Sequence, residues 1–127
     1  MFQNIMLVGF GGFIGSISRY LVVTWVQDVF KTNSFPFGTL IVNIIGCFVI
    51  GIAGGWAQNF QGISSDTRLF LFLGILGGFT TFSAFGYETI TLIYNKNLFF
   101  AFINVFMHLV FGFGAVLLGF NFSKILG

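Results

Sequence analysis

The chain has 127 residues, of which 57% are hydrophobic, 20% are aromatic and only 6% are charged. A soluble domain carries about 25% charged residues, so this chain has too few to cover a surface that faces water. Its composition excludes a soluble enzyme and a disordered protein. The five basic and three acidic residues are scattered along the chain, so no basic patch for nucleic acid is expected. The sequence predicts an all-α membrane protein.

Four apolar segments follow one another, and each is long enough to cross a membrane, which takes about 20 apolar residues. The predicted helices run from about Phe2 to Val26, Gly38 to Gln58, Thr67 to Tyr94 and Leu98 to Phe122. The connections are Gln27 to Phe37, Asn59 to Asp66 and Asn95 to Asn97. Asp66 is the expected N-cap of the third helix. Residues 1–127 are therefore predicted to form a single four-helix transmembrane domain.

The third segment is longer than a membrane requires, because 28 residues would make a helix of about 42 Å against a hydrocarbon core of about 30 Å. Residues 77–83 in its middle read GGFTTFS. Each glycine weakens a helix by about 1 kcal/mol, and the hydroxyls can satisfy backbone groups freed by a break. We predict an interruption near Gly77 to Thr81, of the kind that exposes carbonyl groups to ions. The alternative is a continuous, tilted helix with a glycine-rich packing face.

Pairs of glycines four residues apart occur in three of the predicted helices: Gly11 and Gly15, Gly51 and Gly55, Gly74 and Gly78. This G-x-x-x-G spacing is typical of membrane helices whose backbones approach closely. The run at residues 9–15 is not read as a phosphate loop, since it lacks the G-x-G-x-x-G spacing and a preceding strand.

Basic residues are almost evenly divided between the two ends of the predicted bundle. Arg68 and Lys124 lie on one side, and Lys31 and Lys96 on the other, with Arg19 inside the first helix toward that second side. This distribution gives almost no positive-inside bias, so the chain is expected to insert in both orientations. Four short helices are also too few to enclose a pore. Both points favour an antiparallel (dual-topology) homodimer.

Polar residues within membrane helices are costly and tend to mark function. Thr39 and Asn43 share one face of the second helix, and Asn104 and His108 share one face of the fourth. The first, second and fourth helices contain no acidic residue, whereas cation and proton pathways usually need carboxylates. The available groups are an amide, hydroxyls, one arginine and phenyl edges, which suit a small anion. Phe82 and Phe85 lie on one helical face, where their edges could flank the same passage.

Several of these residues also have a purely structural interpretation. Asn43 could simply bond across helices, and His108 is expected to make an interhelical hydrogen bond, since a lone histidine is a poor metal site. Glu88 lies near the membrane end of the third helix and is interpreted as a capping or water-facing carboxylate. Cys47 is expected to pack as a small apolar residue.

Three motifs in these helices resemble the signatures of the Fluc (CrcB) family of fluoride channels. They are GGFIGSISRY at residues 11–20, GTLIVNIIGCF at residues 38–48 and GGFTTFSAF at residues 77–85. The first matches the family pattern G-G-x-x-G-x-x-x-R-[YW]. Chain length, helix number and motif order agree as well, so the resemblance covers the whole chain.

The resemblance implies an antiparallel homodimer in the cell (inner) membrane with two separate anion pores, through which fluoride is exported passively. It implies that Phe82 and Phe85 form a phenylalanine box across the dimer, and that Asn43 donates its amide to fluoride with Thr39 nearby. Ser83 would belong to the polar track, and Arg19 would lie at the vestibule mouth. Backbone carbonyls of Gly77 and Thr80 from both subunits would hold a central structural Na⁺.

The chain departs from the family pattern at three positions. Ala84 stands where the family usually has threonine, so one pore hydroxyl is missing and conduction is expected to be slower. Gly86 stands where serine is common. His108 occupies a pore-lining position of the fourth helix where a small polar residue would be less surprising.

Two other functions compete with the channel. A dual-topology drug exporter of similar size would need a carboxylate in the first helix, and the sequence has none there. A non-conducting assembly protein would use its polar residues only to hold helices together. No nucleophile–base set or metal cluster is recognisable in the sequence, so an enzyme is not expected.

Overall fold

The computed structural model describes residues 1–32, 34–59 and 63–126. Its helices are α1 (Phe2–Phe30), α2 (Phe37–Asn59), α3 (Ser65–Arg68), η1 (Leu69–Leu76), α4 (Gly77–Phe79), α5 (Phe82–Tyr94) and α6 (Leu98–Leu126). Four helical stretches are long and apolar enough to cross a membrane: Phe2–Phe30, Phe37–Ala57, Ser65–Tyr94 and Leu98–Ile125. The predicted all-α fold with four crossings is confirmed.

The helix ends differ from the predicted ones where local capping decides them. α1 continues past Val26 to Phe30, where Lys31 adopts a left-handed conformation (φ 49°) and donates its N–H to the Gln27 carbonyl. The prediction that Asp66 caps the third helix is wrong. Ser64 is the N-cap, because its hydroxyl accepts the Thr67 N–H at 3.2 Å, and Asp66 lies in the first turn. Residues 60–62 of the predicted second connection lie outside the described residues.

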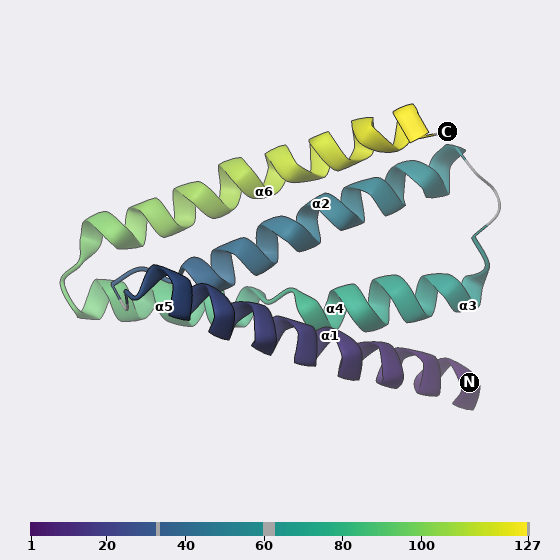
Figure 1. The fold of residues 1–127 in the computed structure, drawn as a ribbon, viewed down its shortest axis with the longest axis horizontal. Helices are drawn as coiled ribbons and strands as arrows, with labels where there is room; N and C mark the ends of the chain where they lie inside the picture. Colours follow the sequence, from purple (N-terminus) through teal and green to yellow (C-terminus); the bar gives the residue numbers. More distant parts are fainter. Residues whose placement is uncertain (33, 60–62, 127) are drawn as a thin grey trace.

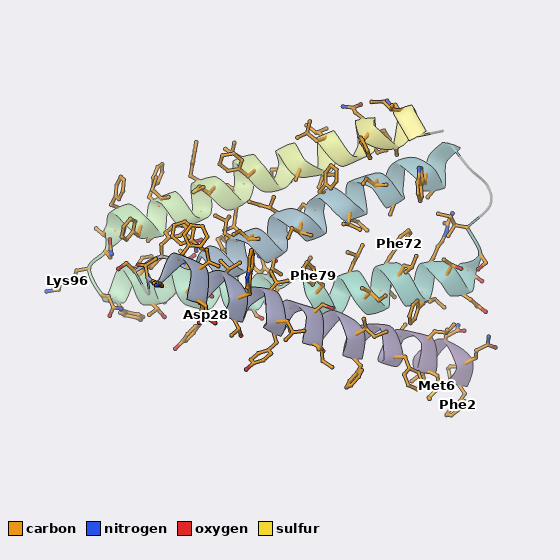
Figure 2. The ribbon with its side chains drawn as sticks, in the orientation of Figure 1. Phe2, Met6, Asp28, Phe72, Phe79 and Lys96 are labelled. Atoms are coloured by element: carbon orange, nitrogen blue, oxygen red, sulfur yellow. The ribbon has the colours of Figure 1, made fainter. Side chains whose placement is uncertain are left out.

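The four crossings form two packed pairs (Figure 1). α6 runs along α2, and α1 runs along η1 and α4. Both chain ends lie at one end of the bundle, and the turn between α5 and α6 lies at the other. Lys96, on that turn, points away from the helices (Figure 2).

Glycines at both helix pairs allow the backbones to touch. A Cβ atom on Gly11 of α1 would lie 2.8 Å from the Cα atom of Gly74 in η1, too close for any side chain. On the other pair, a Cβ on Gly51 would overlap the Val116 carbonyl oxygen, and one on Gly119 would overlap the Phe48 carbonyl oxygen. The close packing predicted from the G-x-x-x-G spacing is confirmed.

The third crossing changes its backbone geometry twice. η1 is a π-helix of eight residues, a rare form with wider turns that often occurs at functional sites. α4 then ends at Phe79 and α5 begins at Phe82. Between them Thr80 (φ −82°, ψ 158°) and Thr81 (φ −152°, ψ 121°) are extended. An interruption was predicted near Gly77 to Thr81. Gly77–Phe79 are helical, so the extended residues are the last two of that range.

Candidate functional site

The two extended residues between α4 and α5 make hydrogen bonds with residues of four helices: η1, α1, α2 and α5. The Thr80 N–H and hydroxyl both donate to the Leu76 carbonyl at 3.0 Å. The Thr81 hydroxyl accepts the Ala84 N–H at 3.2 Å and so caps α5. Arg19 of α1 donates from Nη1 to the Thr80 carbonyl at 3.1 Å. The side chains therefore replace part of the helical bonding that this segment lacks.

Asn43 of α2 pairs with Thr81 through both ends of its amide. Its Nδ2 donates to the Thr81 carbonyl at 2.9 Å, and its Oδ1 accepts the Thr81 N–H at 2.9 Å. This pairing also fixes which end of the amide carries nitrogen, because only Oδ1 can accept from an N–H. The residue does bond across helices, which was one of the two sequence interpretations.

His108 of α6 completes the bonding of this amide. Asn43 Nδ2 lies 3.2 Å from His108 Nε2, and His108 Nδ1 lies 2.9 Å from the Asn104 carbonyl. The interhelical hydrogen bond expected of His108 is confirmed. Among the described residues no group of three or more His, Cys, Asp and Glu side chains that could hold a metal ion is found.

A first cavity of about 470 Å³ opens beside this network. The predicted site residues that line it are Asn43, Gly77, Thr80, Phe82, Phe85 and His108. The rings of Phe82 and Phe85 lie 5.5 Å apart at 53°, and the Phe85 ring lies 4.2 Å from the imidazole of His108. Phe72 of η1 also lines it and points away from α1 (Figure 2). The cavity is otherwise mostly apolar, and Cys47 contributes a half-buried thiol.

A second cavity, of about 710 Å³, is lined by residues of α1, α2 and α5 together with Thr81 of the extended segment. The predicted site residues that line it are Arg19, Thr39, Ser83 and Ala84. Thr81 lines both cavities. The predicted site residues are therefore divided between two cavities that share Thr81.

Glu88, interpreted from the sequence as a capping or water-facing carboxylate, has a side-chain partner on another helix. It is half-buried, lines the second cavity, and accepts the hydroxyl hydrogen of buried Thr39 at 2.6 Å. Its Oε2 atom is buried without a partner among the described residues. The signal missed was helical spacing, since Glu88 lies one turn from Ala84, on the same face of α5.

Comparison with known families gives one match over nearly the whole chain. The family model described as CrcB-like protein, Camphor Resistance (CrcB), matches residues 6–120.

Curated relatives are similar over most of their length. The chain is 47% identical over 117 residues to Fluoride-specific ion channel FluC 3 of Methanosarcina barkeri, which covers 91% of this chain and 86% of the relative. It is 44% identical over 116 residues to Fluoride-specific ion channel FluC of Chlorobium chlorochromatii, covering 91% and 88%. It is 40% identical over 121 residues to the protein of the same name from Clostridium perfringens, covering 95% and 94%.

Proposed function

This chain belongs to the CrcB family of multi-pass integral membrane proteins, and on that premise we propose that it forms a fluoride-selective channel. The channel would let fluoride leave the cytoplasm passively, protecting the cell from fluoride that enters as the weak acid HF. The observation that carries the proposal is the amide of Asn43 beside the rings of Phe85 and His108 in one mostly apolar cavity. The family is one of transporters rather than enzymes.

The chemistry of that cavity suits fluoride. Fluoride is small and strongly hydrated, so a narrow apolar passage must offer replacement ligands for the lost water. The N–H groups of Asn43, nearby hydroxyls and the positive edges of Phe82 and Phe85 offer such ligands. None of these groups carries a fixed charge, which suits conduction, because an ion must be held weakly enough to leave again.

The working unit of the proposal is an antiparallel homodimer with two pores. The second cavity brings Arg19 and Ser83 to the side of a single chain, and Ser83 is exposed there. Polar groups that face lipid at membrane depth are unfavourable. A second copy of the chain would therefore be expected to pack against the face that carries the second cavity. Phe82, which is 81% exposed in the single chain, would then complete a phenylalanine box with residues of the partner.

A structural Na⁺ at the dimer axis is part of the proposal, and the backbone of this chain fits it. The Thr81 N–H donates to Asn43, so the Gly77 carbonyl loses the donor that a continuous helix would supply. The Thr80 carbonyl accepts from Arg19 and keeps a second lone pair. Two such carbonyls from each of two copies would supply the oxygen ligands, and the ion would offset their converging dipoles.

The proposal is tested by growth of a bacterial strain that lacks its own fluoride exporter. The wild-type chain is expected to restore growth in sodium fluoride. The matched control is Asn43→Asp, which has nearly the same shape but offers no N–H to an anion. Growth restored equally by both chains, at equal membrane levels, would contradict the assigned pore.

A further inference from the structure

Both hydrogens of the Asn43 amide nitrogen have acceptors within the protein. An amide nitrogen carries two hydrogens. One is given to the Thr81 carbonyl at 2.9 Å, and the other points to His108 Nε2 at 3.2 Å. An anion that binds this amide must therefore displace one of two acceptors already in place.

The bonding fixes the tautomer of His108. Asn43 Nδ2 is a donor with no lone pair to offer, so His108 Nε2 must be the acceptor. The ring proton is then on Nδ1, which donates to the Asn104 carbonyl at 2.9 Å. Asn104 is fully buried, and the imidazole lies 4.2 Å from the Phe85 ring. The acceptor Nε2 thus belongs to an imidazole ring that is held by the bond to the Asn104 carbonyl and by the contact with the Phe85 ring.

We propose that His108 Nε2 is a resident acceptor that fluoride displaces from Asn43 during permeation, and that this exchange sets how tightly the pore holds the ion. The inference rests on the proposed fluoride channel and assigns a role to a residue of this chain's own fourth helix. His108 acts on the ion through its hydrogen bond with Asn43, so it is a positioning residue.

The two acceptors of Asn43 are not equally easy to displace. Thr81 exchanges two hydrogen bonds with the amide, whereas His108 makes one that is longer. His108 and Phe85 line the first cavity together with Asn43, so fluoride in that cavity would lie near the bond between Asn43 and His108. The amide can therefore keep its orientation on Thr81 while its second N–H changes partner.

This exchange moderates the free energy of binding. An unpaired N–H in an apolar cavity would gain a full hydrogen bond from fluoride and would release the ion slowly. With the imidazole in place, fluoride gains only the difference between two hydrogen bonds. The site then binds fluoride weakly enough for the ion to leave again, as conduction requires.

The first test compares two substitutions of His108 in purified channels in liposomes. His108→Phe retains a ring against Phe85 but has no acceptor, and His108→Gln retains an acceptor oxygen. We expect His108→Phe to lower the half-saturating concentration of sodium fluoride about fivefold, the worth of one net hydrogen bond, and to lower the maximal flux. His108→Gln is expected to stay within about twofold of the wild type, since its oxygen takes over the bond.

The two substitutions separate this inference from the function on which it rests. Absence of fluoride flux from both the wild-type chain and Ala84→Thr would contradict the proposed function. A wild-type channel that carries fluoride, with the same half-saturating concentration in His108→Phe, would overturn the inference alone. Equal shifts in both variants would also overturn it, because they would assign the effect to the ring and not to the acceptor.

A second measurement needs no substitution. His108 is the single histidine of the chain, so ¹⁵N-labelled histidine reports on this ring alone. We expect a protonated Nδ1 and an unprotonated Nε2, and a shift of the Nε2 resonance as sodium fluoride is added, with none from sodium chloride. The opposite tautomer, or an Nε2 resonance unmoved by saturating fluoride, would overturn the inference.

Discussion

Asn43 and Thr81, which lie 38 positions apart in the sequence, exchange two hydrogen bonds of 2.9 Å. One side-chain amide thereby satisfies both backbone groups of a residue that has left the helix. The same contact holds the amide at the wall of the first cavity. The bond that stabilises the extended backbone therefore also positions the proposed anion ligand, so the fold and the site depend on the same residue.

Phe82→Ile is predicted to lower fluoride flux about fivefold, since an aromatic edge contact is worth about 1 kcal/mol. Isoleucine fills the space but has no positive ring edge. The flux would be measured in liposomes at equal protein density. Phe102→Ile is the matched control, because Phe102 is also exposed (66%) but lies on α6 outside both cavities. An unchanged rate for Phe82→Ile would count against the ring's role.

Ala84→Thr is predicted to raise fluoride flux severalfold by returning a hydroxyl to the second cavity, which Ala84 lines. A hydroxyl can both donate to the ion and accept from neighbours. Ala84→Val has the same shape without the oxygen and serves as the control. If valine and threonine changed the flux alike, the hydroxyl would have no part in conduction.

Gly11→Ala is predicted to destabilise the protein by about 1–3 kcal/mol, the usual cost of overpacking. Its new methyl group would lie 2.8 Å from the Gly74 Cα atom. Gly9→Ala is the control, since a Cβ atom there would meet nothing within 4 Å. Thermal unfolding in detergent compares the two. Equal midpoints would show that the α1–η1 contact can widen without cost.

Removal of sodium is predicted to weaken the dimer, because the carbonyls of Gly77 and Thr80 would then converge without a cation between them. Dimer and monomer fractions would be measured by size-exclusion chromatography in sodium chloride and in choline chloride. Chloride is common to both buffers, so only the cation changes. A dimer equally stable in both would argue against the structural ion.

The sequence was sufficient for the parts of the fold that depend on local pattern. Apolar length alone predicted four crossings. Glycine spacing predicted close helix packing, and the contact of Gly11 with Gly74 is one instance of it. Helix ends were less predictable, because Ser64 and Asp66 are both good N-caps and the choice depends on the path of the preceding chain. The π-helix Leu69–Leu76 was not predicted, and the segment packs on α1 in the structure.

The candidate site was predicted residue by residue but not as a network. The contacts of Asn43 with His108 and of Thr39 with Glu88 join positions 65 and 49 residues apart. Such pairings are decided by the packing of α2 against α5 and α6, which no local pattern contains. Glu88 illustrates the difficulty. Its position near the membrane end of the third helix suggested a carboxylate that faces water, whereas its partner Thr39 is buried.

Ion efflux from liposomes that contain the purified wild-type protein is the direct test of fluoride-selective conduction. A fluoride electrode would follow release from liposomes loaded with potassium fluoride, and a chloride electrode would follow matched liposomes loaded with potassium chloride, both after valinomycin is added. We expect rapid release of fluoride, and release of chloride no faster than from protein-free liposomes. Equal release of both anions would contradict selectivity. Absence of fluoride release from both the wild type and Ala84→Thr would contradict the channel itself.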